Sequence, residues 1–299
     1  MGFSSYDDLI SELTAGKRIK KPWQNTSPAV AGVAGKWYST WAWTGSGQAG
    51  SYAVNASLTA AQYYGTTTGA IVVGDAVSPD TKHLLSISAM TPAATAVPGI
   101  AILVDRLLTY PGIVATTAAT QTLTTTATLP RYTDGSGVVA WLEVSTALGN
   151  AGARGIGRMI WSYTNSDGIA GRVNTNPSTV SAIFSGSQFT SIANTGTSSQ
   201  YFTNPFIAYV ASDSGIQSVE QISFNSGTLS AGFMNLILGK VLASVPLPAI
   251  NVLSERDLVF QMANMERVYD GACLCWLYYY PGAVAANTNY IGEIDVAWG

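Results

Sequence analysis

The sequence is poor in charged residues, and long stretches contain none. Charged residues make up 10% of the 299 positions, whereas ordinary globular chains contain about 25%. The ranges 37–74 and 173–212 have no Asp, Glu, Lys or Arg. A surface with so little charge is better suited to being covered by neighbouring subunits than to standing alone in water. The composition therefore favours a component of an assembly.

Long apolar runs are also missing. The most apolar windows are 97–104, which is too short to cross a bilayer, and 233–250, which is interrupted by Lys240, Pro246 and Pro248. We therefore expect no membrane partner. The opening residues are polar and acidic, unlike a signal peptide. A net charge of -3 argues against a nucleic-acid partner, which would select a basic face.

Cysteine and histidine are scarce, which limits the chemistry that the chain can perform. Cys273 and Cys275 are the two cysteines. Their spacing places both side chains on one face of a strand. We interpret them as small buried hydrophobes; a strained disulfide or part of a metal site are the alternatives. His83 is the single histidine and lies in a polar, loop-like stretch. We expect no catalytic residues, no cofactor and no metal.

Acidic residues two positions apart raise the possibility of glycoside hydrolysis, which uses a pair of carboxylates. Such pairs lie near the ends of expected strands and are usually solvated there. The candidates are Glu255 with Asp257, Glu293 with Asp295 and, at wider spacing, Glu266 with Asp270. We therefore expect a protein that is not an enzyme.

From residue 36 onward, short runs rich in β-branched and aromatic residues alternate with Gly, Pro, Asn and Asp. This pattern predicts an all-β fold, a jelly-roll-like antiparallel β-sandwich. The body spans 29–299, with two subdomains possible and a boundary near 130–137. Strands are expected at 36–43, 69–73, 84–89, 99–104, 120–129, 138–144, 157–164, 180–184, 206–211, 216–224, 233–243, 257–262, 271–280 and 290–296.

Residues 1–28 differ from the rest and predict an N-terminal arm. Ser4 or Ser5 can cap a short helix that carries an apolar stripe of Leu9, Ile10 and Leu13. A basic linker and a proline that stops regular structure follow it. The basic residues are interpreted as a solvated linker, as partners of an acidic neighbouring subunit, or as a contact to nucleic acid. They are Lys17, Arg18, Lys20 and Lys21.

Three tryptophans between residues 37 and 43 have odd numbers, so a single strand would place them on one face. Core filling, a contact between subunits and a platform for sugars all remain possible for them. The residues that we single out as a candidate interface are Leu9, Ile10, Leu13, Lys17, Arg18, Lys20, Lys21, Trp23, Trp37, Trp41 and Trp43.

Several segments resemble text found in virion proteins of tailed bacteriophages. They are the opening residues 1–10, the Thr-rich segment 123–138, the turn at 163–172, and the closing segments 266–275 and 294–299. The likeness is scattered over most of the chain and includes no catalytic motif.

The resemblance implies a structural protein of the phage particle, most similar to a capsid decoration or cement protein. Such proteins commonly have β-sandwich folds and often form homotrimers on the shell. The expected partners are the major capsid protein and further copies of this chain, the expected location is the virion, and synthesis is expected in the host cytoplasm. The alternatives are a receptor- or carbohydrate-binding virion protein, or the major capsid protein itself. The long spine helix that the usual tailed-phage shell fold contains is not indicated by any long amphipathic run here.

Overall fold

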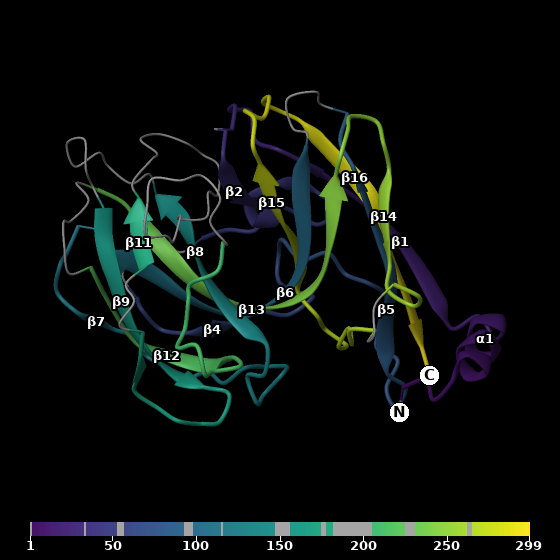
Figure 1. Cartoon of the computed structure of the whole chain (residues 1–299), viewed down its shortest axis with the longest axis horizontal. Helices are drawn as coiled ribbons and strands as arrows, with labels where there is room; N and C mark the ends of the chain where they lie inside the picture. The colour runs from purple at the N-terminus through teal and green to yellow at the C-terminus, as the bar shows by residue number, and fades with distance from the viewer. Residues whose placement is uncertain are drawn as a thin grey trace.

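The computed structural model describes residues 2–32, 34–52, 57–92, 98–114, 116–146, 156–174, 178–181, 205–224, 231–261 and 265–299. The predicted fold class is confirmed: antiparallel β-sheets form the molecule, and within these residues one short α-helix, α1 (Tyr6–Thr14), accompanies them. Figure 1 shows two β-rich halves side by side, with both chain ends close to α1.

Three sheets make up the described chain. The first sheet contains, in spatial order, β14 (Ser254–Asp257), β5 (Lys82–Met90), β16 (Asn289–Trp298), β1 (Arg18–Thr26) and β3 (Thr44–Gly45). The central sheet contains β2 (Lys36–Ser39), β15 (Leu274–Tyr280), β6 (Gly99–Val114), β13 (Phe233–Leu247) and β8 (Val138–Thr146), with β4 (Ala61–Gln62) paired to β6. The third sheet contains β10 (Arg172–Val173), β9 (Ile156–Asn165), β12 (Ile216–Phe224) and β7 (Gln121–Thr122), with β11 (Ser178–Ser181) paired to β9.

Two long central strands join the halves. β6 has 16 residues and β13 has 15, and they pair along most of their length with three register shifts. One end of this pair contributes Leu103 and Val245 to a core shared with the first sheet. The other end contributes Leu108 and Leu236 to a core shared with the third sheet. Because the same strands serve both cores, the halves are parts of one continuous structure (Figure 1).

The segment near 130–137 connects the two cores in space. β13 and β15 carry the chain back to the first half after this segment, so the halves are not consecutive stretches of sequence. Tyr132 packs against both cores at once. Residues near 130–137 thus lie where the two cores meet.

The N-terminal helix forms as expected and packs on the body. Ser5 caps it, because its hydroxyl accepts a hydrogen bond from the Asp8 amide at 3.1 Å. Leu9 and Leu13 pack against Leu85 and Ala297. Ile10 points away from this cluster and is exposed. The apolar stripe is therefore divided between the protein's own core and its surface.

The basic segment after α1 is a strand and not the linker that we expected. β1 pairs with β16 over nine residues, from Arg18 with Ala297 to Thr26 with Asn289. Pro22 fits into this strand because its nitrogen is at a position that makes no hydrogen bond to β16. The Glu293 amide donates to Ser88 on β5, so Glu293 and Pro22 form a non-hydrogen-bonded pair and the Pro22 nitrogen faces the open edge.

The aromatic segment 36–43 is not one strand. β2 ends at Ser39, whose hydroxyl accepts from the Trp41 amide at 3.2 Å and starts a short 3₁₀ helix, η1 (Thr40–Ala42). This turn breaks the two-residue alternation, so the expectation that the three indoles share a face is wrong. Trp37, Trp41 and Trp43 enter three separate clusters of buried residues.

Other expected strands differ in extent. The Thr-rich range 120–129 supplies only the two-residue β7, and neither 206–211 nor 69–73 forms a strand. Ile207 is buried because its side chain fills the second core from a loop, while its amide donates to Ala140. The strand expected at 257–262 is shifted to β14. The range 180–184 lies partly outside the described residues, and β11 covers its beginning.

Candidate functional site

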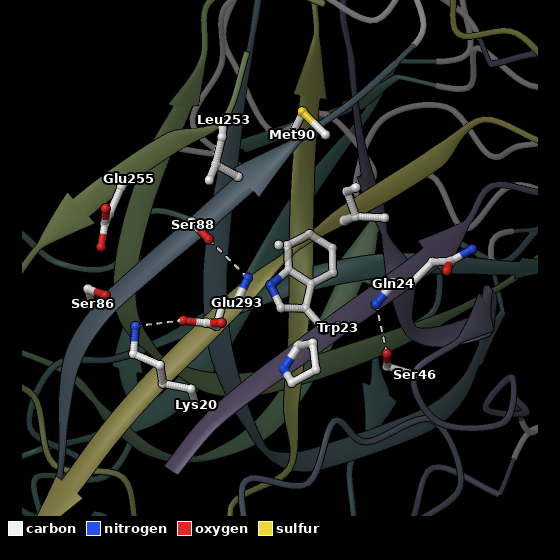
Figure 2. A pocket seen from close by; sticks show the side chains of 13 residues that line it. Lys20, Trp23, Gln24, Ser46, Ser86, Ser88, Met90, Leu253, Glu255 and Glu293 are labelled. Carbon is white, nitrogen blue, oxygen red and sulfur yellow. Dashed lines mark hydrogen bonds and ion pairs between the residues drawn. The ribbon is translucent and has the colours of Figure 1, made fainter. Parts of the chain in front are cut away.

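A groove of about 790 Å³ crosses the outer face of the first sheet. Side chains from β14, β5, β16 and β1 border it, as Figure 2 shows. Its lining residues are Lys20, Pro22, Trp23, Gln24, Ser46, Ser86, Ser88, Met90, Leu253, Glu255, Ile291, Gly292 and Glu293.

Strand register explains why this face is hollow. Glu255, Ser88 and Glu293 lie directly opposite one another on β14, β5 and β16. The central strand β5 contributes the short side chains of Ser86 and Ser88, whereas the flanking strands contribute longer ones. Short side chains between long ones leave a channel. Two strand spacings separate Glu255 from Glu293, which is about 10 Å between their Cα atoms.

The cations of the groove and its margin are paired within the chain. Lys20 Nζ lies 3.3 Å from Glu293 Oε1 and 4.0 Å from Asp295 Oδ2. Arg18 binds both oxygens of Asp295, and its Nε donates to Asp295 Oδ1 at 2.9 Å. These hydrogen bonds raise the pKa of Arg18. The register that pairs β1 with β16 thus aligns basic with acidic residues across the sheet.

The remaining predicted basic residues have different environments. Lys17 forms ion pairs with Glu12 and Asp80, each at 2.9 Å, and these raise its pKa. Lys21 is half-buried on the other face of β1 from Lys20. The structure thus pairs three of the four predicted basic residues with acidic residues of the same chain.

The four predicted indoles are buried in the chain itself. Trp23, Trp37, Trp41 and Trp43 have exposed fractions of 2%, 7%, 1% and 2%. Of the interpretations left open for the last three, core filling describes their position. Trp23 packs on Trp276 with ring centroids 4.7 Å apart and borders the floor of the groove. These side chains leave almost no surface for a partner or for a sugar platform.

A second charged cluster lies inside the central sheet, and the sequence did not reveal it. Arg106 Nη1 donates to Glu143 Oε1 at 2.6 Å, and both side chains are fully buried. Glu143 also accepts from Trp141 Nε1 at 2.8 Å and from the Tyr52 hydroxyl at 2.6 Å. Burial opposes the charge on Glu143, but Arg106 and these donors outweigh it and lower its pKa.

Aromatic rings enclose the Arg106 guanidinium, whose central carbon lies 4.3 Å from the Trp41 ring centre and 5.1 Å from that of Tyr63. The facing position on β13 is Gly239. A Cβ at Gly239 would lie 2.6 Å from the Trp141 ring, so only glycine lets that indole approach the cluster.

Next to this cluster, Arg131 binds Asp105 through two hydrogen bonds of 2.7 and 2.8 Å. Asp105 also accepts from the Cys273 amide at 2.8 Å. Burial raises the pKa of Asp105 against the effect of Arg131. Cys273 and Cys275 are free and buried, as expected. The side chains of Arg106, Glu143, Arg131 and Asp105 are at most 4% exposed, so these four charges are too deeply buried to contact a ligand.

Of the predicted acidic pairs, Glu293 and Asp295 lie on the same face of β16, where both approach Lys20 Nζ, but their environments differ. Asp295 is almost fully buried against Arg18, whereas Glu293 faces the groove. Asp270 binds Lys82 at 3.0 Å, and neither residue lines the groove. The pairing of Glu255 with Glu293 arises only from the strand order, which no spacing in the sequence encodes.

Within the described ranges, no three His, Cys, Asp or Glu residues are grouped to hold a metal ion. In the same part of the chain, no helix has the length and apolar character to cross a membrane. Comparisons with protein-family models, with curated proteins and with solved structures found no match.

Proposed function

We propose that this chain is a structural protein of a tailed-phage particle, a decoration or cement protein that binds the major capsid protein as a homotrimer. The resemblance of residues 1–10, 123–138 and 266–275 to phage virion proteins supports this role. So does the shortage of charge, because low like-charge repulsion favours the crowding of identical copies.

One surface feature carries the proposal. Tyr6 and Ile10 lie one helical turn apart on the outward side of α1 and have exposed fractions of 57% and 59%. Phe260, 77% exposed, stacks on Tyr6 with ring centroids 5.5 Å apart. We call these three residues the α1 apolar surface. Large apolar side chains gathered in this way are typical of protein-binding surfaces.

We expect the chain to dock through this surface and not through a free N-terminal arm. β1 is an integral strand of the first sheet, so deleting residues 1–28 would remove Trp23 from the core and destabilise the body. A useful variant must leave β1 intact. Ile10→Lys combined with Phe260→Lys changes two exposed side chains only. Ile169→Lys is a matched control, because Ile169 is an exposed apolar residue (52%) in the connection between β9 and β10, beside the distant third sheet.

Particles purified from a phage whose genome encodes this chain provide the test. We expect mass spectrometry to find the chain in the particles and antibody labelling to cover the shell. In solution, light scattering should give three times the 31.3 kDa chain mass. The double lysine variant should fail to bind particles stripped of the protein, and Ile169→Lys should bind normally. Absence from the particle, or labelling confined to the tail, would contradict the proposal.

A further inference from the structure

The groove of the first sheet presents polar groups that the protein itself does not use. The Glu255 carboxylate, the Gln24 side-chain amide and the Ser86 hydroxyl have no hydrogen-bond or ion-pair partner among the described residues, although all three line the groove. A ligand with several hydroxyl groups can satisfy such donors and acceptors together.

Apolar surface lies beside these polar groups. Leu253 is 58% exposed and rises at one margin, and Met90 and Ile291 border the same space. Figure 2 shows Leu253 and Met90 at one end of the groove and Lys20 and Glu293 at the other. The volume of about 790 Å³ is within the range of small-molecule sites. A mixed lining of this kind suits a ligand with both hydroxyl groups and C–H faces.

Other classes of ligand fit less well. An anion would meet Glu255 and Glu293, and the lining contributes one cation, Lys20, which is already paired with Glu293. A metal ion would need a third close ligand, and no such group exists in the described chain. A wholly apolar ligand would leave the Glu255 carboxylate desolvated without a partner, which is costly.

We propose that this groove binds a neutral oligosaccharide. Glu255 accepts hydrogen bonds from sugar hydroxyls, Gln24 and Ser86 donate and accept, and Leu253, Met90 and Ile291 contact the C–H faces of the rings. The site is distinct from the α1 apolar surface, so binding of sugar and binding to the shell fail or succeed separately.

The test is a glycan array probed with the labelled full-length protein, followed by calorimetry with the strongest neutral oligosaccharide. We expect at least one neutral oligosaccharide to bind. Glu255→Ala should weaken that binding about tenfold, because it removes a charged hydrogen-bond acceptor. Asp167→Ala is the matched control, since Asp167 is an exposed carboxylate on the β9–β10 hairpin. The Asp167→Ala variant should bind the oligosaccharide with the affinity of the wild type.

A second variant, Ser86→Phe, fills the groove and should abolish binding. Circular dichroism and thermal unfolding establish that each variant is folded; Glu255 is exposed and unpartnered, so its replacement leaves the fold intact even where Ser86→Phe does not. A peptide in which every second residue is lysine is tested as a competing ligand for the groove. No binding across the array, equal affinity in Glu255→Ala, or binding of the peptide in place of sugars would each overturn the proposal.

Discussion

The charged residues of the central sheet and those of the groove are built from the same chemistry but serve different ends. In the central sheet, Arg106 and Glu143 have no exposed side-chain surface. In the groove, the Lys20 and Glu293 side chains are 52% and 40% exposed. Each member of the buried pair is desolvated and depends on the other for its hydrogen bonds. Each member of the exposed pair can exchange the other for water or a ligand. Depth of burial, more than residue type, decides which charges stabilise the fold and which can recognise another molecule.

The largest effect should follow from breaking the buried pair. Arg106→Met leaves the Glu143 carboxylate buried without its cation, which we expect to lower the free energy of unfolding by about 3–5 kcal/mol. Urea denaturation measures it. The double variant Arg106→Met with Glu143→Gln should recover much of the loss, because no buried charge then remains. If Arg106→Met were as stable as the wild type, burial would not determine how much this pair contributes to the free energy of unfolding.

Arg18 and Asp295 lie between the two extremes. Asp295 is only 3% exposed while Arg18 is 41% exposed. Arg18→Gln should therefore cost about 1–2 kcal/mol, less than a fully buried pair and more than a surface pair. The same denaturation measurement applies. If Arg18→Gln lowered the free energy of unfolding as much as Arg106→Met, the contribution of an ion pair to stability would not depend on its burial.

In the third sheet, Asp213 allows the effect of a buried carboxylate on stability to be measured as a function of pH. Burial disfavours the charged form of Asp213, but hydrogen bonds from Arg172, Tyr163 and Asn165 outweigh this and lower its pKa from 3.8 to about 2. Because the folded-state pKa lies below the unfolded value, this stabilisation is complete above about pH 4 and is lost as the pH falls toward 2. Asp213→Asn should thus lose less stability than the wild type between pH 5 and pH 2.5, as urea midpoints would reveal.

The smallest effect is expected in the groove. Lys20→Gln removes an exposed ion pair with Glu293, which we expect to change the free energy of unfolding by less than about 0.5 kcal/mol. Urea denaturation at low and high salt provides the measurement, with Arg18→Gln as the larger reference. A loss above about 1 kcal/mol would mean that the exposed charges also hold the sheet together.

Sequence patterns located most strands wherever one face is apolar and the run is regular. β12 lies at its expected position, and β8 and β9 differ from expectation by only one or two residues at their ends. β6 was expected to end at Val104 because Asp105 and Arg106 follow, yet the strand continues for ten residues. Both charges are buried against residues distant in sequence, Arg131 and Glu143, and local patterns contain no sign of such partners.

The same limit explains the groove and the N-terminal strand. The basic residues of β1 resemble a solvated linker until β16 supplies Asp295 and Glu293 opposite them. Likewise, Glu255 and Glu293 become neighbours only through the order β14-β5-β16. Strand order is a property of the whole fold, so the site could not be assembled from spacing alone, although Lys20 and Trp23 were singled out individually.

Among the described residues, β3 pairs only with Asn25 and Thr26 of β1, so residues 18–24 form an open edge of the first sheet, with a consequence for protein kept at high concentration. Pro22 offers no N–H on this edge, the Arg18 amide donates to Gly16, and the Gln24 amide donates to the Ser46 hydroxyl. An approaching strand from another molecule thus finds no continuous row of backbone donors to template on. Lysine and proline on an edge strand are devices that prevent such pairing. Copies at high concentration are thereby protected against cross-β aggregation at this edge. Any association between them there must use side chains and not backbone hydrogen bonds.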